Sequence, residues 1–284
     1  MKTFRSTLIV RLACALLGTL ATPALQAQQL DLGAAGQYAA FILHDASGLE
    51  SVRGRLAVGR DLDAGRLELG AGLQGGDDAL AALVVRRNVK HFSDGAIWNG
   101  AGRKGYGVVG VSVAEAGPGL DLRKEALPFD FDAEAMWLTM LTARLGGMPA
   151  SGKVQLQGGV LILRGSNGPL EVFQLTAAQA ASNATLQLAD VADGAWVLIN
   201  VAADKQREVR LRLQQDALRG HQSRTLFNFP DAERLRLEGA RVWGSLLAPA
   251  ALASGEGGAV EGTLVVADWK GRADIGHAPF VAGP

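Results

Sequence analysis

The sequence contains a single cysteine, Cys14, in a chain of 284 residues. One thiol forms no intramolecular disulfide and no Cys-ligated metal cluster. Neither sign of charge is in excess, because 28 lysines and arginines balance 28 aspartates and glutamates. A nucleic-acid partner is therefore not expected, since neutralising phosphates requires a clustered basic excess. The hydrophobic content of 48% supplies a sizeable core and excludes a disordered chain.

Histidine is scarce as well, and the candidate metal ligands do not cluster. The histidines lie far apart, with no pair at helical spacing: His44, His91, His221 and His277. Three aspartate pairs offer oxygen ligands, but none continues into a calcium loop: Asp61 with Asp63, Asp77 with Asp78, and Asp130 with Asp132. The Gly-x-Ser-x-Gly elbow of serine hydrolases is missing. The sequence therefore predicts no catalytic residue, no cofactor and no metal site.

Long apolar runs are also missing, apart from a short one near the N-terminus. Three basic residues and no acidic one accompany the mostly apolar stretch Leu12–Leu20, which is too short to span a bilayer. Small residues follow it as far as Ala27. This pattern predicts a secretory signal peptide over residues 1–27, with an internal amphipathic helix as the alternative. Cys14 would leave with the signal peptide. A single exported domain of residues 28–284 would remain, without stable membrane insertion.

Short apolar runs separated by Gly, Asn and Asp make up most of the remaining chain. Eight of them fit β-strands: Arg55–Val58, Arg66–Leu69, Ala82–Val85, Gly107–Val113, Val160–Leu163, Leu170–Phe173, Ala195–Val201 and Val209–Leu213. The run Ala195–Val201 barely alternates in polarity, which is typical of a strand covered on both faces. A short helix is expected at Thr176–Ala181. The chain is therefore predicted to be mainly β.

One segment has helical spacing instead. Apolar residues recur every three or four positions at Leu138, Leu141, Leu145 and Met148. Asp130 or Asp132 precedes them as a candidate N-cap, and two glycines follow. This pattern predicts a helix over Ala133–Leu145. Trp137 and Met140 lie on its other side, so most of its circumference is apolar and we expect it to pack against the β body.

The strongest internal signal is a repeat of 18 residues. Val242–Leu247 reads VWGSLL and Val260–Val265 reads VEGTLV, which match position by position. Such a length is typical of one turn of a narrow parallel β-solenoid. A third copy, Val52–Ala57, lacks the hydroxyl residue. We therefore predict a parallel, right-handed β-solenoid with one long flanking α-helix, in which equivalent residues of successive turns stack directly.

Further motifs occur in a fixed order over nearly all of residues 28–284. They are LGAAGQY at 32–38, GRLAVGRDL at 54–62, FDFD at 129–132, VFQL at 172–175, VLINV at 197–201, FNFPDA at 227–232, GSLLAPA at 244–250 and GHAPF at 276–280. Together they resemble the choice-of-anchor A family, secreted or surface proteins with an adhesive domain related to ice-binding-like adhesion domains. The resemblance implies a β-solenoid with a helix along its coils and an adhesive function. The family commonly has a C-terminal surface anchor, which we do not expect here. The single Gly59-Arg60 and the spacing of Asp274 from His277 depart from the family pattern.

Three functions remain open. The first is a secreted or cell-surface adhesin-like module without catalytic activity, which holds an extracellular protein or glycan on one broad side. The second is a polysaccharide-active enzyme on the same scaffold, with Glu238, Glu256 and Glu261 as candidate carboxylates. The third is a structural matrix or coat component that self-associates. Ice binding is not expected, because only six threonines follow residue 27.

Other local patterns have structural explanations. Gly100–Gly105 matches G-x-G-x-x-G but precedes a strand-like run rather than a helix, so we expect a Gly-rich loop. Asn228, two residues before a proline, is expected in a turn, with an amide ladder or a ligand contact as alternatives. His277 is expected to be a packed capping residue. Several arginines are expected on solvated strand faces, with an acidic glycan partner as the alternative: Arg86, Arg87, Arg207, Arg210 and Arg212.

Overall fold

The computed structural model describes residues 30–74, 80–100 and 102–284. The predicted signal peptide, Cys14 and the pair Asp77 and Asp78 lie outside the described residues. The described part is mainly β, as the sequence predicts. Within it, no helix has the length and apolar character needed to cross a membrane.

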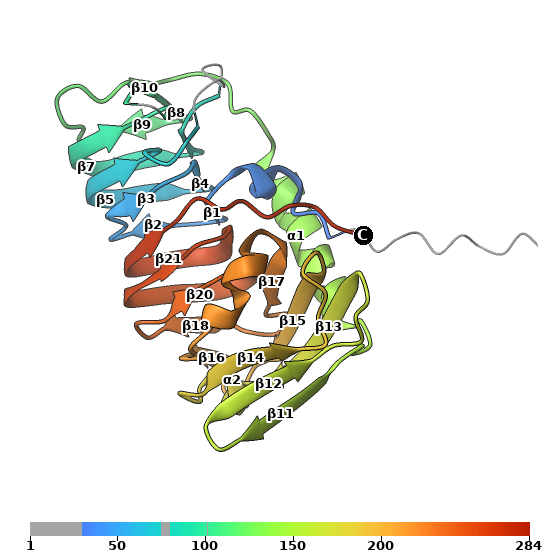
Figure 1. Cartoon of the computed structure of the whole chain (residues 1–284). Helices are drawn as coiled ribbons and strands as arrows, with labels where there is room; N and C mark the ends of the chain where they lie inside the picture. The colour runs from blue at the N-terminus through green and yellow to red at the C-terminus, as the bar shows by residue number, and fades with distance from the viewer. Residues whose placement is uncertain (1–29, 75–79, 101) are drawn as a thin grey trace, which may run out of the picture.

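Ten strand segments stack in parallel to form the first side of the molecule (Figure 1). In spatial order they are β13 (Leu170–Thr176), β15 (Trp196–Ala202), β17 (Thr225–Asn228), the start of β20 (Ser245–Val260), the start of β21 (Leu264–Ile275), β1 (Ala40–Ile42), β4 (Leu56–Val58), β6 (Leu83–Val85), β8 (Gly107–Val109) and β10 (Leu122–Arg123). Parallel pairing keeps equivalent residues of neighbouring strands in one row, so the same side-chain position faces inward at every level.

Two further sets of strands complete the wall. The second side contains β16 (Glu208–Leu211), β18 (Arg234–Leu237), the middle of β20 and β21, β2 (Ala46–Ser47), β5 (Asp61–Leu69), β7 (Asn88–Ile97) and β9 (Ser112–Val113). The third contains β19 (Arg241–Val242), β3 (Ser51–Val52) and the ends of β20, β21, β5 and β7. Because β2 and β3 each pair with both β21 and β5, these four strands close a ring.

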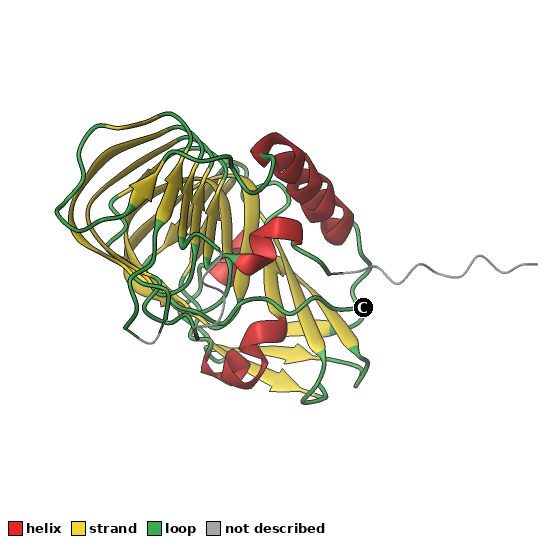
Figure 2. Ribbon diagram, turned by 90° about the horizontal axis from the view of Figure 1, so that it is seen from above, coloured by secondary structure: helices red, strands yellow, loops and turns green. Residues whose placement is uncertain are grey.

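The order of the strands places the N-terminal turn in the middle of the stack. Phe41 of β1 pairs with Val265 of β21 on one side and with Ala57 of β4 on the other. The chain runs from β1 to β10 at one end, and α1 (Phe131–Gly146) returns along the outside (Figures 1 and 2). The strands from β13 to β21 then lead back to β1. We call the contact of β1 and β2 with β21 the seam.

The repeat lies in directly paired strands. Val242 pairs with Val260, Leu246 with Leu264, and Leu247 with Val265. Val52 of the third copy continues the valine row, because it pairs with Ile275, the partner of Val260. The predicted strand Gly107–Val113 is divided into β8 and β9. A Cβ atom at Gly110 would lie 2.2 Å from the Arg86 carbonyl oxygen, which explains why glycine stands at this corner.

Apolar side chains form two layers. The inward residues of the three sides fill the interior, and a second layer lies between the first side and α1. Leu138, Leu141 and Leu145 are buried in this second layer. The helix begins after Asp130, whose carboxylate accepts hydrogen bonds from the backbone N–H groups of residues 132 and 133. The helix thus packs against the β body as expected, whereas Met140 on its other side is 56% exposed, because α1 has neighbours on one side only.

A separate small sheet covers the β13 end of the stack (Figure 1). It consists of β11 (Lys153–Gln157), β12 (Val160–Arg164) and β14 (Thr185–Ala189), and it buries Leu161, Leu163 and Leu186 against the interior. The expected short helix is α2 (Ala177–Ala180), capped by Thr176. Two 3-10 helices, η1 (Gly33–Gln37) and η2 (Asp216–Arg224), complete the described elements.

Candidate binding site

Helix α1 covers part of the first side and is attached to it by hydrogen bonds. Asn228 of β17 donates to the Thr142 carbonyl oxygen at 3.0 Å and to Asn200 Oδ1 at 2.8 Å, and it accepts from the Thr142 hydroxyl. Asn200 donates to the Leu145 carbonyl oxygen at 2.9 Å, and Gln174 to the Met148 carbonyl oxygen at 3.0 Å. The prediction of a turn at Asn228 was therefore wrong, and the amide-ladder alternative is correct. The three amides bind carbonyl groups in and just beyond the last turns of the helix.

The second side carries an uninterrupted row of outward polar side chains. Alternate positions of its strands point inward, at Val209, Leu235, Ala253, Trp269, Ala46, Leu62 and Val89. The residue after each inward one points outward, except in β7, where the outward residue His91 comes two positions after Val89. The outward residues are Arg210, Arg236, Ser254, Lys270, Ser47, Asp63 and His91. We call these seven residues the polar ladder. Parallel pairing spaces them by about 4.8 Å, and each is exposed or half-buried.

At one end of the polar ladder, arginines surround one carboxylate. Glu208 is only 8% exposed and accepts from Arg210 at 2.8 Å and from Arg234 at 3.1 Å, with Arg236 at 3.2 Å. The hydrogen bond from Arg210, supported by the other two cations, lowers the pKa of Glu208. The arginines of this side do lie on an exposed strand face, but they are held in ion pairs with acidic side chains.

At the other end, carboxylates alternate with basic groups. Asp63 lies 3.7 Å from His91, and Asp61 lies 3.0 Å from Lys90. Burial raises the pKa of Asp61, but hydrogen bonds from Lys90 and Asn88 outweigh it and the net pKa is lowered. The calcium alternative for Asp61 and Asp63 gains no support, because these groups already pair with basic side chains. Within the described ranges, no three potential ligands converge on one point.

A second row of side chains ties the same levels together. Asp268 accepts from the backbone N–H of Asp45 at 3.1 Å, and Asp45 accepts from that of Asp61 at 3.1 Å. Asn88 donates to Asp61 at 2.8 Å and accepts from the hydroxyl of Ser112 at 2.7 Å. Each of these bonds joins neighbouring turns, and the first crosses the seam. The row therefore fixes the spacing of the adjacent polar ladder.

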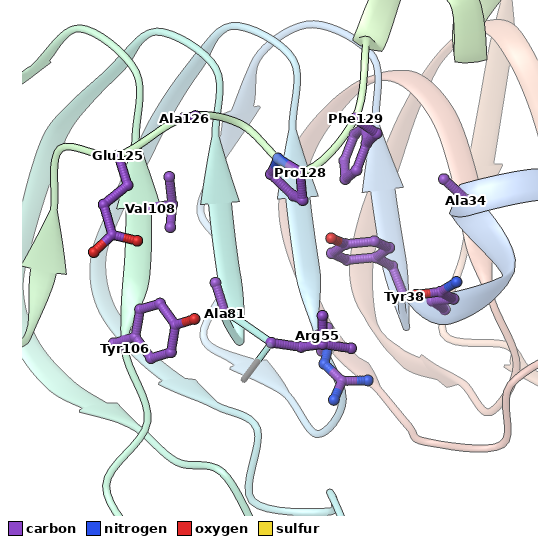
Figure 3. Close-up of a pocket in the computed structure, with 12 residues that line it drawn as sticks. Ala34, Tyr38, Arg55, Ala81, Tyr106, Val108, Glu125, Ala126, Pro128 and Phe129 are labelled. Atoms are coloured by element: carbon purple, nitrogen blue, oxygen red, sulfur yellow. The ribbon is translucent and has the colours of Figure 1, made fainter. Parts of the chain in front are cut away.

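A pocket of about 330 Å³ opens on the first side, beyond the N-terminal end of α1 (Figure 3). Tyr38 and Tyr106 form opposite walls, with Ala81 between them, and Glu125 and Phe129 belong to the segment that leads into α1. The Tyr38 ring packs edge-on against Phe129, with their centroids 5.6 Å apart. Burial raises the pKa of Tyr38 to about 12, so its hydroxyl stays protonated at neutral pH. No spacing in the sequence predicts that these residues meet.

The three candidate catalytic glutamates lie against different basic groups. Glu238 pairs with Arg212, Glu261 pairs with Arg241, and Glu256 stands beside Arg272 in strand register. A glycosidase needs two carboxylates on either side of one bond. Glu238 and Glu261 are engaged in ion pairs, whereas Arg272 beside Glu256 pairs with Glu50 at 3.0 Å, so these contacts do not single out two of the three carboxylates as such a couple.

The remaining predicted features are structural. His277 packs over Gly54, where a Cβ atom would lie 2.6 Å from the imidazole Nδ1. Burial, with the charges of Arg55 and Arg53, lowers the pKa of His277. Gly100–Gly105 precedes β8 and not a helix, although residue 101 is outside the described part. Of the paired arginines, Arg86 binds Asp132 through two hydrogen bonds of 2.6 and 2.7 Å, and so attaches the first turn of α1 to the sheet.

Comparison with known families gives one match that covers most of the chain. A family model described as "Putative Ice-binding-like adhesive domain" matches residues 31–277. Neither the curated proteins nor the solved structures contain a match. The match supports the adhesive part of the expectation, whereas the narrower choice-of-anchor A assignment stays a prediction. Because the matched region includes every turn of the stack and the helix beside it, the chain belongs to this ice-binding-like adhesive domain family.

Proposed function

We propose that the protein is an exported, non-catalytic adhesive module that binds an extracellular protein or glycan through the polar ladder. The observation that carries this proposal is the register of seven outward polar side chains on a side that α1 does not cover. A flat row of regularly spaced hydrogen-bonding groups offers many weak contacts to a broad partner. Membership of an adhesive domain family agrees with such a role.

Export, the domain boundaries and the detailed architecture belong to the same proposal. The basic and apolar pattern of residues 1–27 supports a signal peptide that is removed from a single domain of residues 28–284. Parallel pairing at every level supports the proposed β-solenoid. The ordered motifs support a choice-of-anchor A protein. An extracellular location follows from the proposed signal peptide.

Ice binding is a weaker explanation of the same surface. The polar ladder contains no threonine and includes two arginines, a lysine and an aspartate. Charged groups hold their own hydration water strongly, so they do not present the regular methyl and hydroxyl array of a threonine ladder. A partner with polar and charged groups of its own is a better complement.

Binding to arrayed glycans and matrix proteins tests the proposal. The purified wild-type protein is compared with the ladder variants Ser254→Trp and Lys270→Glu, and with Met136→Glu as the control on the exposed side of α1, where Met136 is 66% exposed. We expect both ladder variants to weaken binding at least about tenfold and the control to retain it. Equal binding by all four proteins would contradict the proposal. Release of reducing sugar ends from a polysaccharide would favour an enzyme instead.

A further inference from the structure

We infer that the pocket between Tyr38 and Tyr106 binds a hexopyranose unit of a glycan. This site lies on the first side, whereas the polar ladder lies on the second, so the inference does not rest on the proposed function. Its volume of about 330 Å³ is at the lower end of the range for small-molecule sites. The pocket is therefore suited to one or two sugar rings rather than to a folded partner.

The walls of the pocket combine apolar surfaces with hydroxyl groups. In Figure 3 the hydroxyls of Tyr38 and Tyr106 point toward one another across the space above Ala81, and Phe129 lies over Tyr38. A pyranose ring has one face of C–H groups, which packs on aromatic and methyl surfaces, and a rim of hydroxyls. Each tyrosine hydroxyl can both donate and accept, as a sugar hydroxyl does.

The charged groups extend this complementarity. Arg55 and Glu125 also line the pocket, and in Figure 3 the Arg55 side chain lies below the space between Ala81 and Tyr38, with Glu125 above Tyr106. Arg55 supplies only hydrogen-bond donors, whereas the carboxylate of Glu125 supplies only acceptors. Neutral sugar hydroxyls satisfy both kinds of group. A phosphate or sulfate group would meet the carboxylate of Glu125, and a fatty acyl chain would offer no hydrogen bond to the polar groups of the pocket.

The aromatic walls are held in place before any ligand arrives. Tyr38 is 6% exposed and contacts Phe41 as well as Phe129, with ring centroids 5.7 and 5.6 Å apart. The guanidinium of Arg123 lies 3.9 Å from the centroid of the Tyr106 ring, and it is anchored by Asp121 at 2.6 Å. Side chains that are already ordered lose little entropy on binding, which favours a small ligand with few contacts.

Saturation-transfer NMR and calorimetry with a panel of methyl glycosides test the inference. The panel contains the methyl glycosides of glucose, galactose, mannose, fucose and N-acetylglucosamine. We expect at least one to bind the purified protein with a Kd in the millimolar range. Glu125→Gln and Tyr106→Phe should each weaken that binding about fivefold, because each removes one hydrogen-bonding group from an otherwise unchanged pocket.

Two controls keep the outcome decisive. Met136→Glu on the exposed side of α1 should bind the glycoside as the wild type does, and Glu125, which is exposed, can be replaced without disturbing the core. The inference is overturned if no glycoside binds, or if both pocket variants bind as the wild type does. Loss of glycoside binding in Lys270→Glu alone would assign the sugar to the polar ladder and would also overturn it. If the ladder variants bind the arrayed partners as the wild type does, the proposed function is contradicted, but the glycoside result for the pocket still stands.

Discussion

At the residue scale, Asn228 joins the helix to the sheet. Its amide bonds to Thr142 and to Asn200 in a fully buried position. We expect Asn228→Leu to lower the free energy of unfolding by about 3 kcal/mol, because it leaves buried polar partners without hydrogen bonds. Urea denaturation followed by circular dichroism measures this loss.

The matched control for Asn228 is Gln174, the exposed end of the same ladder. Gln174→Leu should cost about 1 kcal/mol or less, since water can replace its bond to the Met148 carbonyl oxygen. Equal losses for the two variants would contradict the role assigned to the buried amide.

His277 gives the protein a dependence on mild acid. Its folded-state pKa lies below the ordinary value of 6.5, because of burial and the charges of Arg55 and Arg53. The unfolded chain therefore binds the proton more readily than the folded one. Stability should be full above about pH 6.5, fall as the pH drops below it, and level off below the folded-state pKa. Melting temperatures between pH 5 and 8, roughly the range in which histidine titrates, should show this slope in the wild type and a flatter one in His277→Gln. An unchanged slope in the variant would assign the effect to other groups.

Local sequence patterns predict the structural roles of only some residues. Asp130 is recognisable as an N-cap because capping depends on the two or three residues that follow. The role of Asn228 depends on Thr142 and Asn200, which are distant in the sequence, and the nearby proline pointed to a turn instead. The pocket residues come from five separate segments, so no local pattern could predict that they meet.

At the scale of elements, strand β20 contains a direct test of the stacking. Leu246 is fully buried in the interior, whereas Leu252 on the same strand is 45% exposed. We expect Leu246→Asp to destabilise the protein by several kcal/mol or to prevent folding, because it places an unpaired charge among apolar side chains. Leu252→Asp should have nearly wild-type stability in thermal melts. A small effect of Leu246→Asp would mean that this side chain faces water.

The periodicity of apolar residues predicted those elements well whose burial depends on a single packed side. All eight predicted strands fall on observed ones, and the leucine spacing of α1 corresponds to its buried side. The exposed side of α1 was not predictable, because Met136 and Met140 carry no sign of whether another layer covers them. The small sheet of β11, β12 and β14 was likewise only partly indicated, by the run that became β12.

At the scale of the whole molecule, the seam joins strands that are far apart in the sequence. Ser47 of β2 and Lys270 of β21 are paired across it, while Ser254 and Lys270 are paired within the second half. A disulfide in Ser47→Cys/Lys270→Cys closes a far longer loop than one in Ser254→Cys/Lys270→Cys. We expect it to stabilise the oxidised form by about 5 kcal/mol, against about 3 kcal/mol for the shorter loop. Denaturation with and without reductant measures both values, and a larger effect of the shorter loop would contradict this arrangement.

The 18-residue repeat predicted that neighbouring turns stack, and β20 and β21 pair accordingly. It did not predict that the first turn inserts between the last turn and the second. Ala40 and Leu264 pair directly although 224 positions separate them, and such a contact leaves no period in the sequence. Such a contact depends on the fit between the surfaces of distant strands and not on a local sequence pattern.

The seam also sets the order of events during synthesis. The ribosome delivers residues 40–42 early, yet one edge of that strand has no partner until residues 264–266 have emerged. For most of translation, an unsatisfied row of backbone N–H and C=O groups is available to other chains. The last pairing to form therefore involves the first strand of the fold. Any factor that shields the nascent first turn would raise the yield of the folded protein.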